Sequence, residues 1–355
     1  MARPTRAVIH RSALRGNLAR ARRCNPQARI LAVIKANGYG HGLLRVANTL
    51  ADADGFAVLD LDAAVQLRDA GHNTRIVLLE GFFEAAELLL FAEHRLTAVV
   101  HSAEQIEVLE RLSLPRPIDV FLKLNSGMNR LGFTEPAFVG ALSRLRASAN
   151  VDQIVLMSHF ACADDEKGVD WQLQIWRRVT GGLQLPVSLS NSAAILRYPE
   201  LAGDWGRPGI MLYGASPFAD QTAQELGLAP AMTLTSRIIA TQNLVSGATV
   251  GYGASFVASG EMRVGVVACG YADGYPRHAS TGTPIVVAGR RTRLIGRVSM
   301  DMLCVDLTDL PEAGVGAEVV LWGRGMPVEE VAAAAGTVSY ELLCALAARV
   351  PVIED

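Results

Sequence analysis

Short, continuous apolar runs punctuate the first 214 residues of this chain of 355 residues. Most of the eight runs are followed by a stretch with the spacing of an amphipathic helix, for example 61–68 and 103–112. Strands that are apolar throughout and alternate with helices indicate a parallel sheet covered on both faces. The runs are RILAVIK, GFAVLD, RIVLLEG, LTAVVHS, DVFLKLN, QIVLMSHF, VSLSNS and GIMLYG.

Eight strand–helix units of this kind predict an α/β fold with a closed sheet. A (β/α)8 barrel of the TIM type needs eight units in roughly 200–250 residues. A doubly wound open sheet is the alternative. We expect the barrel, and we place it over residues 1–228.

The pattern changes near Leu228, Ala229 and Pro230. Strand-like segments with frequent glycine turns follow, which is typical of a mostly-β domain. We expect this second domain over residues 229–355, with two short helices over VEEVAAAAG and SYELLCALAARV. The expected strands lie in MTLTSRIIATQNL, MRVGVVACGY, TPIVVAG, RTRLIGRVSMDMLCVDL and GAEVVLWG.

Composition excludes two classes of partner. No apolar stretch reaches about 18 residues, so we expect no membrane span. The net charge of −2 gives no electrostatic reason to expect nucleic acid. The five cysteines are an odd number without metal-type spacing, which predicts reduced thiols in a cytoplasmic protein.

The beginning of the chain is basic: residues 1–51 hold ten basic side chains and no acidic one. A transit peptide has this composition, but the same stretch contains the first apolar run. A solvated helix face is therefore our interpretation, and without an apolar segment of signal-peptide type we expect no secretory signal. The arginines of this face are Arg11, Arg15, Arg20, Arg22 and Arg23.

Two of the three lysines stand where a surface lysine would not. Lys35 and Lys123 close apolar runs, whereas Lys167 lies in a polar loop. Thirty arginines indicate an arginine-favouring genome, which explains the rarity of lysine but not this placement. A lysine at the end of a buried strand is costly as an ammonium ion and useful as a base or Schiff-base former.

Polar residues follow several of the expected strands, and in a barrel such residues meet at one rim. They include no carboxylate cluster of the kind that binds metal. Loops after strands seven and eight of barrels commonly bind phosphate through N–H groups and hydroxyls, and 191–194 and Gly209–Ile210 supply such donors. With Lys35 across the mouth, this set suits a phosphorylated aldehyde held as an imine, pyridoxal 5′-phosphate.

The segment AVIKANGYGHG resembles the cofactor-lysine motif of the alanine racemase family, whose members are pyridoxal-phosphate enzymes of fold type III. The resemblance covers the chain from Ala7 to near Pro351. It implies an isomerase that interconverts L- and D-alanine, as a homodimer, for bacterial cell-wall peptidoglycan synthesis or D-alanine catabolism. Segments that resemble the family in the right order are LKLNSGMNRLGF, SHFA, SNSAA, RPGIMLYG, VGYGASF, GYADGYPR, GRVSMDM and SYELLC.

The resemblance also implies roles for single residues around the cofactor. Lys35 would bind it as an imine, His159 would pack against the ring, and Arg207 would face the pyridine nitrogen. The phosphate would be held by Tyr39, Ser192, Gly209, Ile210 and Tyr340.

For the substrate, the resemblance implies Tyr252 as the second catalytic base, reaching in from a partner subunit. Arg130 and the backbone at Met300 would contact the substrate carboxylate. Lys123 matches a position that can carry a carbamate paired with Arg130. The entrance would be formed by Asp164, Tyr271 and Arg297.

Racemisation requires a proton to leave one face of the substrate Cα and another to arrive at the opposite face. Lys35 and Tyr252 suit this task, although their unperturbed pKa values of about 10.4 and 10 are too high at neutral pH. Burial lowers the pKa of a lysine and nearby cations lower that of a tyrosine. We expect Arg207 and His159 to supply this positive potential.

Arg207 also bears on the type of reaction, because an arginine does not give a proton to the pyridine nitrogen. A decarboxylase on the same scaffold is expected to place an acid there. A racemase of broader specificity is a further possibility, as is a non-enzymatic protein that binds the cofactor. Such a carrier has no need of Tyr252 as a base on the opposite face of the substrate.

Overall fold

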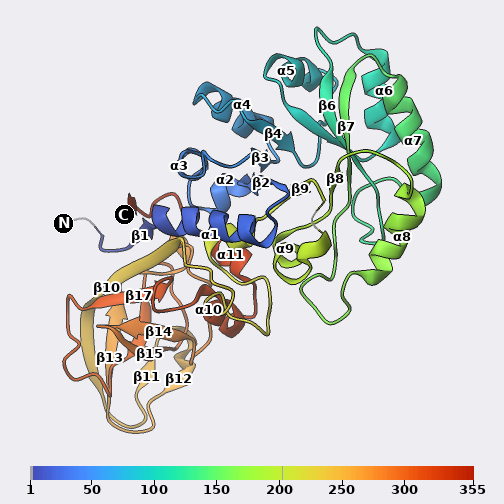
Figure 1. Ribbon diagram of the computed structural model, residues 1–355. Coiled ribbons are helices and arrows are strands. Elements are labelled where there is room, and N and C mark those ends of the chain that lie inside the picture. The colour runs from blue at the N-terminus through green and yellow to red at the C-terminus, as the bar shows by residue number, and fades with distance from the viewer. Residues whose placement is uncertain (1–2, 202) are drawn as a thin grey trace.

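The computed structural model describes residues 3–201 and 203–355. Figure 1 shows two bodies, a barrel built from the blue, green and yellow part of the chain and a smaller β body built from its orange and red part. Both bodies share one large hydrophobic core cluster.

The barrel contains eight parallel strands whose order follows the chain from β2 to β8, with β9 beside β2. The two ends of this sheet meet, since Asp204 N–H donates to Val187 O at 2.8 Å and Arg207 N–H to Ser190 O at 2.9 Å. A doubly wound sheet reverses its strand order at a switch point, and this sheet does not, so the barrel prediction is confirmed. The strands are β2 Arg29–Val33, β3 Gly55–Val58, β4 Arg75–Leu78, β5 Thr97–Val100, β6 Ile118–Lys123, β7 Val151–Met157, β8 Val187–Ser188 and β9 Trp205–Gly206.

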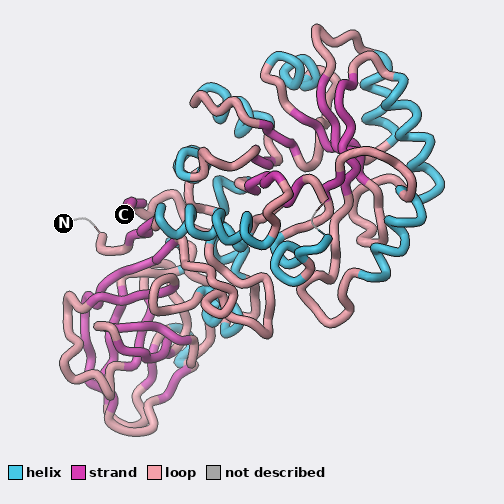
Figure 2. Tube along the Cα trace, viewed as in Figure 1, coloured by secondary structure: helices cyan, strands magenta, loops and turns pink. Residues whose placement is uncertain are grey.

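Helices connect these strands and cover the outside of the barrel (Figure 2). The first helix buries Ala13, Leu14 and Leu18 and exposes Arg15 and Arg23, as an amphipathic helix should. Within the described residues, none of the helices combines the length and apolar character needed to cross a bilayer. The helices of this half are α1 Arg11–Cys24, α2 Lys35–Tyr39, α3 Leu43–Thr49, α4 Leu61–Asp69, α5 Glu87–Glu93, α6 Ala103–Arg111, α7 Glu135–Ala147, α8 Asp170–Thr180 and α9 Ser192–Arg197, followed by the 3-10 turn η1 Pro199–Leu201.

The eighth expected strand, GIMLYG, is wrong. Ile210–Tyr213 forms a 3-10 helix, η2, and the strand that closes the barrel is the two-residue β9 just before it. The run is apolar because all four residues are buried against the core. This 3-10 helix is held against β2 by a side chain and not by strand pairing, since Tyr213 Oη donates to Val33 O at 2.9 Å.

The second body is a mostly antiparallel sheet, and all five strand-like segments form strands there. β10 pairs with both β13 and β17, which folds the sheet around the core. The elements are β10 Met232–Leu244, β11 Thr249–Val250, η3 Tyr252–Ala254, β12 Phe256–Val257, β13 Met262–Val267, η4 Tyr271–Asp273, β14 Pro284–Val287, β15 Arg290–Ile295, β16 Leu303–Asp306, β17 Glu318–Trp322, α10 Val328–Ala334, α11 Ser339–Cys344 and β18 Val352–Glu354.

The first strand, β1 Arg6–Ile9, lies in this second sheet although its residues fall within the range expected for the barrel. It pairs antiparallel with β10, with Arg6 opposite Thr235, and parallel with β18, with Ala7 opposite Val352. A four-residue apolar strand carries no signal for a partner more than 200 positions away. The second half of the chain also contributes to the barrel, because α11 packs against α2 at the barrel mouth.

Candidate active site

Lys35 follows β2 directly, at the start of an unusual turn. The next four residues, Ala36, Asn37, Gly38 and Tyr39, all have positive φ, between 49° and 60°, so the chain makes one left-handed turn. This conformation costs free energy in residues with a side chain. Asn37 Oδ1 offsets part of the cost by accepting from Leu43 N–H at 2.8 Å. The turn leaves Lys35 half-buried at the barrel mouth.

A cavity of about 890 Å³ opens at the carboxyl ends of the strands. It contains residues from most of the barrel strands and from α11, so the expectation that one rim gathers them is met. The predicted site residues that line it are Lys35, Tyr39, Lys123, Arg130, His159, Asp164, Ser192, Arg207, Gly209, Ile210 and Tyr340.

Arg207 is a buried cation with neutral partners. Its guanidinium donates to Ser188 Oγ at 2.6 Å, Ser158 O at 2.8 Å and Leu189 O at 3.1 Å. Among the described residues no carboxylate lies within ion-pair distance of it. Burial lowers the pKa of Arg207 to about 10, so the group stays charged at neutral pH and its charge is uncompensated within the chain.

His159 lies beside Arg207, and its Nδ1 is 3.3 Å from the guanidinium. Since the arginine can only donate, Nδ1 accepts and Nε2 carries the proton. Burial and then Arg207 hold the pKa of His159 well below its usual range. His159 is therefore neutral, and the expectation that it adds positive potential is wrong.

The hydroxyl of Ser192 joins two segments of the rim. Its Oγ accepts from Gly209 N–H at 2.8 Å and Met211 N–H at 3.3 Å, which leaves its own hydrogen free to be donated. Helix α9 is capped by Asn191, whose Oδ1 accepts from Ala194 N–H at 3.0 Å. Ser192 is therefore not the residue that caps α9.

Two tyrosines complete this side of the cavity. Tyr39 stacks on Tyr213 with ring centroids 4.5 Å apart, and Tyr340 lies 6.1 Å from Tyr39. Burial raises the pKa of Tyr39, and burial followed by Asp164 raises the pKa of Tyr340 to about 12. Both phenols are therefore protonated at neutral pH and can donate a hydrogen bond.

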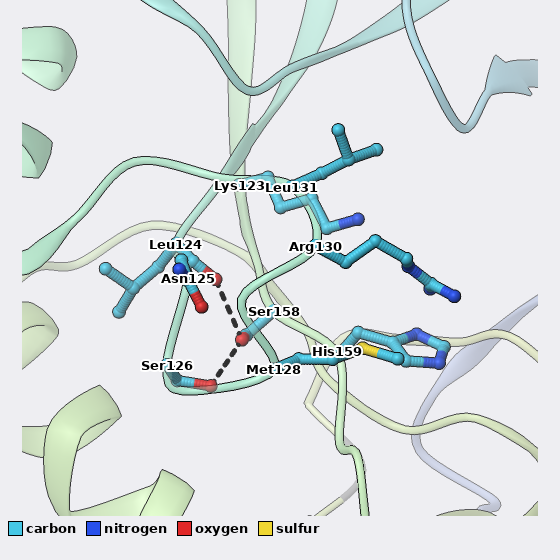
Figure 3. A pocket seen from close by; sticks show the side chains of 9 residues that line it. All are labelled: Lys123, Leu124, Asn125, Ser126, Met128, Arg130, Leu131, Ser158 and His159. Carbon is cyan, nitrogen blue, oxygen red and sulfur yellow. Dashed lines mark hydrogen bonds between the residues drawn. The ribbon is translucent and has the colours of Figure 1, made fainter.

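Lys123 and Arg130 line a second, smaller pocket that adjoins the first (Figure 3). Lys123 ends β6 with only 6% of its surface exposed. Burial, then Arg207 and Arg130, lowers the pKa of Lys123 to about 8. A substantial neutral fraction therefore exists in mildly alkaline solution, and the residue does not extend to solvent as an ordinary surface lysine would.

A buried amide underpins this region. Gln172 of α8 is completely buried and donates to Ser126 Oγ and to His159 O, each at 3.0 Å, while Ala161 N–H donates to its Oε1 at 2.7 Å. Ser126 in turn lies 2.7 Å from Ser158 (Figure 3). The network ties the loop after β6 to the loop after β7.

Four predicted residues lie outside this cavity, on the second body: Tyr252, Tyr271, Arg297 and Met300. We call them the far face. Tyr252 is 69% exposed and Met300 53%. Their loops touch, since Tyr271 N–H donates to Ser299 O at 3.1 Å and a Cβ on Gly253 would lie 3.1 Å from the Arg297 guanidinium. The chain thus gathers its site residues into two separate groups.

The sequence interpretation missed three titratable residues of the cavity, namely Glu80, His101 and Cys344. Glu80 and His101 follow β4 and β5, so the strand-end rule that found Lys35 would also have found them. Burial lowers the pKa of His101. Cys344 depends on the docking of α11, which no local pattern predicts.

The fold and the site define a barrel enzyme with a lysine-centred cavity that a second, β-rich domain adjoins. Residues 9–217 match the family of alanine racemase N-terminal domains, and residues 231–354 match that of the C-terminal domains. The chain belongs to the alanine racemase family.

Individual relatives agree along the full length. The chain is 59% identical to an alanine racemase of Nitrosospira multiformis over 98% of this chain and 99% of that one. It is 57% identical to one of Nitrosomonas europaea, over 100% and 99%. A crystal structure of a biosynthetic alanine racemase from Pseudomonas aeruginosa superposes with a TM-score of 0.98 at 50% identity, covering both chains completely.

Proposed function

We propose that the protein interconverts L- and D-alanine with pyridoxal 5′-phosphate bound at Lys35 and with two bases, one from each subunit of a homodimer. The observation that carries the proposal is the composition of the cavity. Lys35 lines the same cavity as a set of hydroxyl and N–H donors and a buried guanidinium. Family membership supports the same activity.

The residues present fit the cofactor. A volume of about 890 Å³ is in the range of cavities that hold a cofactor and a small substrate. The uncompensated charge of Arg207 calls for an electron-rich partner, which the pyridine nitrogen supplies. The free hydroxyl hydrogen of Ser192 and the phenols of Tyr39 and Tyr340 are donors for a phosphate.

When bound, the cofactor withdraws electrons from the substrate and so weakens the Cα–H bond. The chain's own task is to move the proton. Lys35 lines the cavity, and its amine would take or give a proton on one face of Cα. Arg207 would donate to the ring nitrogen without protonating it, which would limit electron withdrawal and favour return of the proton over side reactions.

We place the base for the opposite face in the other subunit. Tyr252 is the candidate, and its exposure supports a role in another subunit's site. Tyr271, Met300 and Met302 of the same domain are also exposed side chains with large apolar surfaces, which suits a surface covered by a second copy. In the partner's cavity, Arg207 and Arg130 are the cations that would favour the ionised phenol.

Lys123 would hold Arg130 in position. A neutral amine can add carbon dioxide to give an anionic carbamate, and the lowered pKa of Lys123 supplies neutral amine. The anion would then accept a charge-assisted hydrogen bond from Arg130 and leave the guanidinium oriented toward the substrate carboxylate.

The test uses the three lysines of the chain. Purified protein is reduced with borohydride and its peptides are mapped. We expect the label on Lys35. The Lys35→Ala variant should lose both the label and the activity. The Lys167→Ala variant, in which an exposed lysine is replaced, should keep both. A label on another residue, or no racemisation of alanine in a panel of amino acids, would overturn the proposal.

The shared site has its own test. Lys35→Ala and Tyr252→Phe subunits are each expected to be inactive, but a mixed dimer contains one complete site. We expect activity to return on mixing. Continued inactivity of a demonstrated mixed dimer would mean that each subunit is self-contained.

A further inference from the structure

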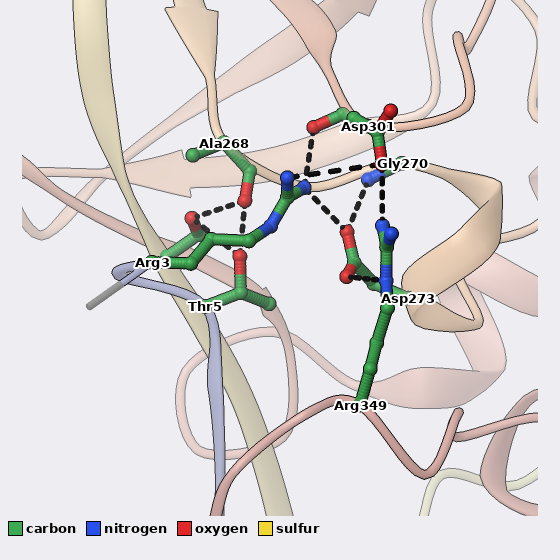
Figure 4. Close-up of polar contacts among 8 residues, drawn as sticks. Arg3, Thr5, Ala268, Gly270, Asp273, Asp301 and Arg349 are labelled. Atoms are coloured by element: carbon green, nitrogen blue, oxygen red, sulfur yellow. Dashed lines mark hydrogen bonds and ion pairs between the residues drawn. The ribbon is translucent and has the colours of Figure 1, made fainter.

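A compact cluster of charges joins Asp273 and Asp301 to Arg3 and Arg349 (Figure 4). The carboxylate of Asp273, 1% exposed, accepts from Arg3 and from Arg349, each at 2.8 Å, and from Gly270 N–H at 2.9 Å. Arg349 also reaches Asp301 at 2.7 Å. We call Arg3, Asp273, Asp301 and Arg349 the Asp273 cluster. It contains two positive and two negative groups, of which Asp273 is buried while the other three side chains are 37–42% exposed.

The cluster joins the two loops that carry the substrate-contact candidates of the far face. Asp273 is the last residue of η4, which begins with Tyr271, and Asp301 directly follows Met300. The loops are also paired along their backbones, through Tyr271 N–H to Ser299 O at 3.1 Å. Fixing Asp273 and Asp301 to common guanidinium groups therefore fixes the spacing of Tyr271 and Met300.

The two arginines come from opposite ends of the chain. Arg3 precedes β1, and Arg349 follows α11. None of the four cluster residues lines the cavity of its own chain. Tyr252 lies on another loop, η3, whose glycine packs against Arg297. The cluster is thus connected to Tyr271 and Met300 more directly than to the candidate base.

We infer that the Asp273 cluster is a positioning element for substrate binding in the partner subunit's active site, where it holds Tyr271 and the Met300 backbone at their working separation. This inference rests on the proposed function. Asp273 is the buried member of the cluster, and its loss would leave Gly270 N–H and both guanidinium groups without the acceptor that they share. The loops would then separate or shift, while the cavity that holds Lys35 would keep its own contacts.

In the homodimer, Asp273→Asn should raise the KM for alanine about tenfold, since small misplacements of positioning groups cost factors of this order or more. The kcat should fall much less, and borohydride labelling of Lys35 should be unchanged. Asp306→Asn is the matched control. Asp306 is also mostly buried in this domain and accepts from an arginine, Arg293, at 2.9 Å and from a backbone N–H. The KM of the Asp306→Asn variant should stay at the wild-type value.

Mixed dimers decide between action in the same subunit and action in the partner. A Lys35→Ala subunit paired with a Tyr252→Phe subunit has a single working site, formed by the barrel of the second and the far face of the first. Asp273→Asn is placed either in the first subunit, across from the working barrel, or in the second. Arg3→Gln provides a milder change if Asp273→Asn fails to fold, because Arg3 is half-exposed at the start of the chain.

We expect a raised KM only when the change is in the subunit that lends its far face. An equal rise in both arrangements, a rise only in the other arrangement, or no rise in either would overturn the inference. Inactivity of the mixed dimer before Asp273→Asn is added would instead refute the shared site on which the proposed function depends.

Discussion

The hydroxyl of Tyr39 lies directly against the backbone of Gly209, so that a Cβ built on Gly209 would come within 2.7 Å of that oxygen. The contact joins the left-handed turn after Lys35 to the segment that follows β9. It therefore connects the first and the last strand of the barrel at the cofactor side of the cavity.

Gly209→Ala should displace the Tyr39 hydroxyl and weaken cofactor binding. Overpacking of this kind costs about 1–3 kcal/mol, which corresponds to a Kd roughly five- to a hundredfold higher. Titration of the apoprotein with pyridoxal 5′-phosphate, followed by absorbance, measures it. Gly140→Ala on α7, where a Cβ meets nothing within 4 Å, is the control, and equal Kd values for the two variants would contradict the prediction.

Carbon dioxide should bind to Lys123 in proportion to its neutral amine. Because the pKa of Lys123 is lowered to about 8, the carbamate signal at constant dissolved carbon dioxide should grow as pH rises through about 8. Carbon-13 NMR with labelled carbon dioxide detects it, and Lys123→Arg should abolish the signal. Carbon dioxide removal should raise the KM for alanine roughly tenfold, the size expected for a lost hydrogen bond to a charged group; a KM indifferent to carbon dioxide would argue against the carbamate.

Arg207→Gln should raise the pKa of His159. Burial is the larger cause of the lowered pKa of His159 and Arg207 the second, so the pKa should move upward but remain below that of an exposed histidine. Its imidazole would then begin to gain a proton at a higher pH than in the wild type. NMR titration of the His159 ring is the measurement, with exposed His278 as the internal reference. An unchanged or lower pKa would mean that the guanidinium charge is not felt at the ring.

Gln172→Ala should destabilise the protein by about 2–3 kcal/mol, because it leaves Ala161 N–H and His159 O without the buried amide that pairs with both. Denaturation of the cofactor-loaded dimer by urea measures the loss. Gln174→Ala, at an exposed position of the same helix, should stay within about 0.5 kcal/mol of wild type. Similar values for both variants would show that the amide network does not contribute to stability.

The barrel was predictable from sequence as far as its strands are buried on both faces. Runs such as 118–123 and 151–157 are largely apolar, and the structure makes them β6 and β7. Ile210–Tyr213 is just as apolar but forms a 3-10 helix, because burial alone does not specify backbone conformation. The true eighth strand, Trp205–Gly206, is too short to have any periodicity.

The cavity side of the site was predictable for a related reason, namely that strand ends converge in a barrel. That rule applied to Glu80 and His101 equally, and they were missed because neither stood out chemically in its run. Burial and its electrostatic consequences were not accessible. His159 was expected to add positive potential, but burial and then its contact with Arg207 hold its pKa well below the usual range and keep it neutral.

The position of β1 between β10 and β18 limits how this protein can be divided or made. During synthesis on the ribosome, the sheet of the second body stays incomplete until residues 352–354 have emerged, although β1 is translated among the first ten residues. A cleavage at the junction near Pro230 would leave β1 attached to the barrel fragment and remove it from its sheet. When the two halves are expressed separately, the second half should therefore fold better if β1 is moved to it and joined after β18.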